Sequence, residues 1–119
     1  MASVPQPIQE IISDYLQRVG NQIKIDKVIL FGSYAKGQFS NDSDLDLAVF
    51  SDDFIGMEPI ERFRLLFLQA ADYGLDLQPL AFTISDLTEP AGIVAEILNT
   101  GQEITITGTF RPSDEVRRG

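Results

Sequence analysis

The chain has 119 residues, which suits one domain and leaves little room for a second hydrophobic core. It contains no cysteine and no histidine, so its own residues cannot form a disulfide, a Cys/His zinc site or a Ser–His or Cys–His catalytic pair. Its formal net charge is −9, and an acidic surface repels phosphate backbones, so we expect no direct nucleic-acid binding by the isolated domain. The absence of a signal-like start or a membrane-length apolar run predicts a cytoplasmic protein.

Taken in chain order, the apolar pattern first predicts a helix over residues 7–20 and then strands over 23–31 and 44–50. A second helix is expected over 58–73. Its core face is predicted to be the apolar stripe of Ile60, Phe63, Leu66, Phe67 and Ala70. A third strand over 75–83 contains Pro79, which favours the edge of a sheet or a bulge. Ser85 is expected to cap a helix that runs to residue 98, and residues 103–107 to form a short last strand.

This order predicts an α/β (α+β) domain with a small mixed sheet. The sheet is expected to be mixed because the first two strands are joined by a loop and not by a full crossover helix. About four strands would be flanked by about four helices, counting a short helix after residue 32. The domain is predicted to span residues 1–108, followed by a polar tail over 109–119.

The candidate chemistry lies in residues 29–50, ILFGSYAKGQFSNDSDLDLAVF, where two common motifs fail. Gln38 and Phe39 stand where a P-loop needs Lys and Ser/Thr to bind phosphate and magnesium. Leu47 stands where an EF-hand loop needs glycine for its sharp turn. The segment therefore predicts neither an ATPase nor a calcium loop.

The interpretation that remains rests on strand geometry. Asp44 and Asp46 are two residues apart, so on a strand their carboxylates share one face and can converge on magnesium. The alternative is an ordinary amphipathic strand whose acidic side chains are exposed to solvent. Gly32 and Ser33 could bring backbone N–H groups and a hydroxyl to a phosphate, or could form an ordinary small-residue turn. Asp76, on a later strand, could pair beside Asp46 and complete a two-metal cluster for phosphoryl or nucleotidyl transfer.

Gly32-Ser33, ten residues, then Asp44-x-Asp46 resembles the Gly-Ser-x10-Asp-x-Asp signature of the DNA polymerase beta-like nucleotidyltransferase superfamily. The chain is similar to its minimal nucleotidyltransferase (MNT) branch from about residue 8 to 106. The resemblance implies a nucleotidyltransferase fold in which Asp44 and Asp46 bind metal and Asp76 is the third carboxylate.

The same resemblance implies roles for the residues around the turn. Gly32 and Ser33 would hold the phosphates of the nucleotide, and Lys36 stands where these proteins often carry an arginine that contacts phosphate. The expected cofactors are two Mg²⁺ ions, with Mn²⁺ as a substitute, and the expected substrate is ATP.

The function that the resemblance implies is transfer of AMP from ATP to a hydroxyl on a partner protein. The chain has no room for an acceptor domain of its own, so another chain must supply the acceptor. Family members of this size often act as the antitoxin of a HEPN ribonuclease toxin and modify a tyrosine on it. The alternative is a catalytically silent nucleotide-binding or interaction subunit, and the sequence leaves open whether the chain forms a homo-oligomer.

Overall fold

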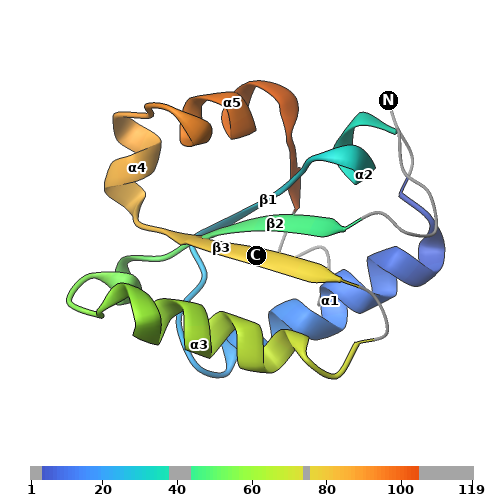
Figure 1. The fold of residues 1–119 in the computed structure, drawn as a ribbon, viewed down its shortest axis with the longest axis horizontal. Coiled ribbons are helices and arrows are strands. Elements are labelled where there is room, and N and C mark those ends of the chain that lie inside the picture. Colours follow the sequence, from blue (N-terminus) through green and yellow to red (C-terminus); the bar gives the residue numbers. More distant parts are fainter. Residues whose placement is uncertain (1–3, 38–43, 74–75, 105–119) are drawn as a thin grey trace, which may run out of the picture.

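The computed structural model describes residues 4–37, 44–73 and 76–104. Within these ranges a four-stranded sheet lies between two layers of helices (Figure 1). The helices α1 (Gln6–Gly20) and α3 (Pro59–Ala70) cover one face, and α4 (Ile84–Thr88) and α5 (Ile93–Thr100) lie over the other. The predicted α/β class with a small mixed sheet is confirmed.

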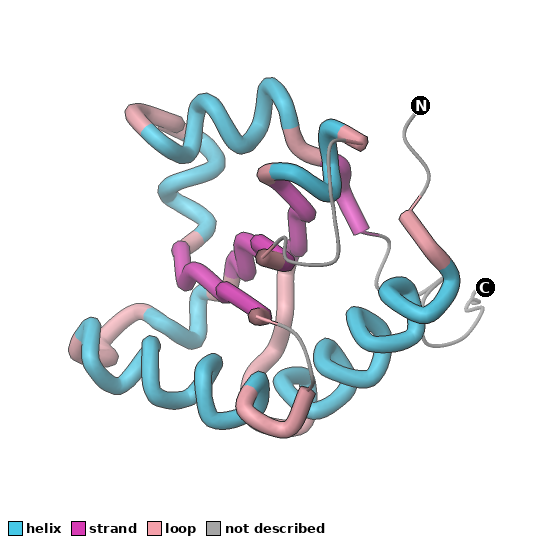
Figure 2. The backbone as a smooth tube through the Cα atoms, turned by 45° about the vertical axis from the view of Figure 1, so that its right-hand side comes forward, coloured by secondary structure: helices cyan, strands magenta, loops and turns pink. Residues whose placement is uncertain are grey.

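The sheet has the strand order β3-β2-β1-β4. Its strands are β1 (Lys27–Phe31), β2 (Leu45–Phe50), β3 (Leu77–Phe82) and β4 (Gln102–Ile104). β1 pairs antiparallel with β2 and with β4, whereas β2 pairs parallel with β3. Figure 2 shows the strands enclosed by helices on two sides. β3 is an edge strand, which agrees with the prediction from Pro79, because an edge tolerates a missing N–H donor.

The two faces of the sheet carry separate cores. Leu45, Leu47 and Val49 of β2 point into the larger core, together with the buried side of α1. Ala48 and Phe50 point the other way, into the smaller core beneath α5. Because side chains alternate along a strand, the acids at the start of β2 share the face of this smaller core.

Several predicted boundaries are wrong. β1 begins at Lys27 and not at residue 23, because the chain first turns off α1, with the N–H of Ile23 donating to the carbonyl of Val19 at 3.0 Å. The helix expected over 85–98 is two helices, α4 and α5. Thr83 caps α4 in a capping box, and the helix ends before Pro90 and Gly92, whose φ is +57°.

Other sequence predictions fall partly or wholly outside the described residues. These are the start of the third strand at 75, the end of the last strand at 105–107, and the tail at 109–119. A one-turn 3₁₀ helix over Asp52–Phe54 was not predicted. None of the helices in the described ranges combines the length and the apolar character that a bilayer crossing requires.

The predicted core stripe of α3 is also wrong in part. Leu66 and Ala70 are buried, but Ile60, Phe63 and Phe67 are 59%, 52% and 40% exposed. The helix carries more apolar residues than one face can hold, and the sheet contacts only one of its sides. A second apolar side therefore faces outward.

Candidate functional site

The first component of the site is the turn that ends β1. Gly32 has φ +76° and ψ −151°, a conformation that essentially only glycine adopts. The short helix α2 (Ser33–Lys36) follows, and the N–H of Lys36 donates to the carbonyl of Gly32 at 3.2 Å. Tyr34 and Ala35 are buried in the larger core and anchor this helix. The predicted sequence of strand, tight turn and short helix is confirmed.

The second component is the carboxylate of Asp46, which lies directly against the turn. Asp46 pairs with Phe31 in the antiparallel ladder, so it stands beside the last residue of β1. A Cβ atom added to Gly32 would lie 2.3 Å from Oδ2 of Asp46. Only a residue without a side chain lets the two approach this closely. The Gly32 turn and the Asp46 carboxylate are therefore close neighbours in the site.

Asp44 and Asp46 form an acidic pair with unequal surroundings. Asp44 is exposed, whereas Asp46 is half-buried. Burial raises the pKa of the Asp46 carboxyl, and the charge of Asp44 raises it further. A positive charge beside the pair reduces the repulsion between the two carboxylates. Carboxylate oxygens are also the ligands that Mg²⁺ prefers. The donor set therefore fits a hard divalent cation.

The third predicted acid, Asp76, lies beside this pair but not where we expected it. In the parallel ladder Gln78 is the partner of Asp46, and Leu45 pairs with Leu77. Asp76 precedes that pair, which puts it level with Asp44, and its carbonyl accepts the N–H of Leu45 at 2.7 Å. The prediction that Asp76 pairs beside Asp46 is therefore wrong, although all three acids lie at the same end of neighbouring strands. In the described ranges, no three acidic side chains converge closely enough to hold one ion together.

The remaining predicted residues lie on α2. Ser33 is partly buried at the first position of this helix, and Lys36 is exposed at its last. Their roles toward phosphate stay predictions. The role of Gln102 of β4 was not predicted. Its side-chain amide donates to the carbonyl of Ala35 at 3.0 Å and ties α2 to the sheet. Gln78, an exposed amide opposite Asp46, was not predicted either, because no local signal in the sequence specifies the register between β2 and β3.

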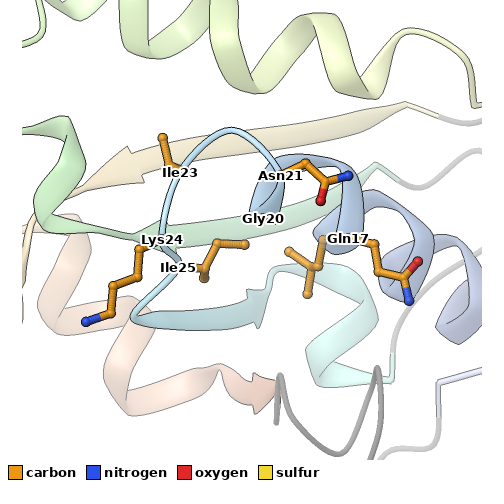
Figure 3. A pocket seen from close by; sticks show the side chains of 7 residues that line it. Gln17, Gly20, Asn21, Ile23, Lys24 and Ile25 are labelled. Atoms are coloured by element: carbon orange, nitrogen blue, oxygen red, sulfur yellow. The ribbon is translucent and has the colours of Figure 1, made fainter.

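A surface hollow of about 360 Å³ lies elsewhere, between the end of α1 and the segment that leads into β1 (Figure 3). Its lining includes Gln17, Asn21, Lys24 and Ile25. Ile25 precedes β1 whereas Gly32 follows it, so the hollow and the acidic pair lie at opposite ends of that strand. This hollow has no acidic lining residue and is distinct from the candidate site.

The fold and the acidic pair beside the turn define the class of protein, a nucleotidyltransferase. The chain belongs to the polymerase beta nucleotidyltransferase family, since the family model described as "Polymerase beta, Nucleotidyltransferase" matches residues 10–108. The match covers every predicted site residue and both cores.

Individual relatives agree with this assignment. The chain is 25% identical to the predicted protein adenylyltransferase MJ0141 of Methanocaldococcus jannaschii over 100 residues, covering 82% of this chain and 98% of that protein. Its fold is similar to that of a predicted nucleotidyltransferase from Sulfolobus solfataricus, with a TM-score of 0.58 and 14% identity over 69% of this chain and 72% of the other. It is also similar to a chain of a toxin–antitoxin complex with AMP-PNP, with a TM-score of 0.56 and 19% identity over 87% and 76% of the two chains.

Proposed function

We propose that this nucleotidyltransferase transfers AMP from ATP to a hydroxyl group of a partner protein. The observation that carries the proposal is the contact between the Gly32 turn and the Asp46 carboxylate. It brings a backbone that can approach a phosphate next to acids that can hold a cation. The relative MJ0141, predicted to adenylylate proteins, supports a protein acceptor for this chain.

We assign each residue a role from its position in the site. Asp44 and Asp46 would hold Mg²⁺, which when bound neutralises phosphate charge and acts as a Lewis acid. The turn at Gly32 and the Ser33 hydroxyl would bind the phosphates and orient the triphosphate for in-line attack. Lys36 would place a positive charge near the phosphates.

Asp76 would serve the acceptor rather than the triphosphate. It is exposed beside the edge strand β3, where a side chain of another protein can reach it. In the proposed step the acceptor oxygen bonds to the α-phosphorus, the bond between the α- and β-phosphates breaks, and pyrophosphate leaves. The acceptor proton passes to the Asp76 carboxylate, since the chain has no histidine to take it.

We propose further that the acceptor is a tyrosine on a HEPN-type ribonuclease toxin, and that the pair works in the cytoplasm, where ATP is available. Two structural relatives, both from toxin–antitoxin pairs, support a toxin as the partner. One is the toxin–antitoxin complex with AMP-PNP, and the other is a variant of the MntA–HpeT toxin–antitoxin pair, at 18% identity and a TM-score of 0.53.

The test is incubation of the chain with α-³²P-ATP, Mg²⁺ and the protein encoded next to its gene, followed by mass spectrometry of the product. We expect an added AMP on one tyrosine of that protein. Asp76→Asn should keep most of the ATP binding and lose the transfer, whereas Asp46→Asn should lose both. Label from γ-³²P-ATP would indicate a kinase. Metal-dependent ATP binding without any transfer would indicate the silent subunit instead.

A further inference from the structure

Large apolar side chains are exposed on α3 and in the loop that precedes it. We call this group the α3 outer face; it consists of Ile55, Ile60, Phe63, Phe67 and Leu68. Its members are between 40% and 63% exposed. The rings of Phe63 and Phe67 stack on each other at 4.9 Å between centroids, so they form one preorganised ridge.

The spacing of these residues suits a helix as the partner. Ile60, Phe63 and Phe67 are three and four residues apart, the pattern by which one helix packs against another. Leu66 and Ala70 of the same helix are already in the core, so α3 is apolar on two sides. A surface helix normally keeps its outward side polar, and large apolar side chains that are exposed close together, as Phe63 and Phe67 are, mark an interaction site.

The location leaves the nucleotide site free. α3 lies in the helix layer under one face of the sheet, whereas Asp46 shares the opposite face with the core beneath α5 (Figure 1). A partner bound to the α3 outer face would therefore not cover the acidic pair.

The charges around the face indicate which partner fits. Four exposed acids, Asp52, Asp53, Glu58 and Glu61, lie at the end where α3 begins, whereas Arg64 is the base on the outward side. The whole chain carries 18 acidic and 9 basic residues, so a second copy would bring the same excess of negative charge. A basic partner is attracted instead.

We propose that the α3 outer face docks an amphipathic helix of a different protein, with lysine or arginine beside its apolar ridge. The inference does not rest on the proposed transfer reaction, because none of its residues belongs to the nucleotide site. It adds to that proposal a place where a protein partner could be held.

The experiment is an NMR titration of the ¹⁵N-labelled chain with a synthetic amphipathic helical peptide that has lysines beside a leucine ridge. A second peptide has glutamate in place of each lysine. Phe67→Glu tests the face. Asn99→Asp, an exposed site on α5, is the control because it changes the net charge by the same amount. Sedimentation velocity of each protein alone reports self-association.

We expect the lysine peptide to shift the amide signals of residues 55–68 and to bind more weakly at higher salt. Phe67→Glu should weaken the binding of the lysine peptide by about tenfold or more, and Asn99→Asp should weaken it by less than about twofold. Asp46→Asn should bind the peptide like the parent, which separates this test from that of the transfer. Equal binding of the two peptides, no binding of either, or a dimer that Phe67→Glu dissociates would each overturn the proposal.

Discussion

Replacing Gly32 with alanine perturbs the turn and the acid at once. Alanine is strained at φ +76° and ψ −151°, where non-glycine residues cost about 1–3 kcal/mol. Its Cβ would also lie 2.3 Å from Oδ2 and 3.2 Å from Cγ of Asp46, so the carboxylate must rotate away. For a domain of this size, the backbone cost alone lowers the melting temperature by roughly 5–15 °C. Displacing the carboxylate should weaken Mg²⁺-dependent ATP binding by about tenfold or more.

Gly56→Ala is the matched control. Gly56 has φ +91°, and a Cβ atom there would meet nothing within 4 Å. This variant should lose about 1–2 kcal/mol of stability through backbone strain alone and bind the nucleotide like the parent. Thermal unfolding by circular dichroism and calorimetric titration of Mg²⁺-ATP measure the two effects separately. If Gly32→Ala binds Mg²⁺-ATP as tightly as Gly56→Ala, the turn is only structural and our assignment of the site is wrong.

The remaining predictions concern Asp46 and Gly101. Without metal, Asp46→Asn should have a higher melting temperature than the parent, by on the order of 1–4 °C. The reason is that the substitution removes a half-buried charge beside Asp44. An unchanged or lower melting temperature would contradict this prediction. Burial and Asp44 raise the folded-state pKa of Asp46 above its unfolded value, so the parent should lose stability as the pH rises between these two values. Melting curves across acidic pH should show that loss in the parent and not in the variant. In Gly101→Ala the Cβ would lie 2.7 Å from the carbonyl oxygen of Ile97 and 2.8 Å from that of Leu30, so we expect a destabilisation of about 3 kcal/mol or more in urea unfolding.

Much of the fold follows from local patterns in the sequence. The two-residue spacing of Asp44 and Asp46 agrees with the structure, in which the alternate residues Leu45, Leu47 and Val49 face the larger core. Pro79 correctly predicted an edge strand. The positions of β1 and α1 were approximately right, because a glycine or a turn ends each apolar run.

The errors arose where local patterns compete with tertiary packing. Phe63 and Phe67 fit a core stripe, but periodicity cannot tell which apolar side of α3 meets the sheet. Pro90 and Gly92 were overlooked as the break in a single long helix. The pairing of Asp76 depends on the register between β2 and β3, which the intervening α3 sets and no local signal specifies.

The candidate site was predictable in composition but not in geometry. The resemblance to the family signature singled out Gly32, Asp44 and Asp46, and the structure brings Gly32 and Asp46 into contact. The half-burial of Asp46 and the position of Gln78 opposite it depend on how three strands align. That alignment is a property of the sheet as a whole.

The strand order has a consequence for folding. All predicted site residues lie within 32–76, on a hairpin and one crossover, whereas β4 joins β1 through residue pairs that are distant in the sequence, such as Val28–Ile104. Closing a loop of that length costs more chain entropy than forming the β1–β2 hairpin. We therefore expect the acidic pair and its glycine turn to assemble first, with β4 added late. Pulse-labelled hydrogen exchange should then show early protection of β1 and β2, and equally early protection of β4 would contradict this order. If β1 and β2 pair first, the candidate site exists, in outline, before the sheet that supports it is complete.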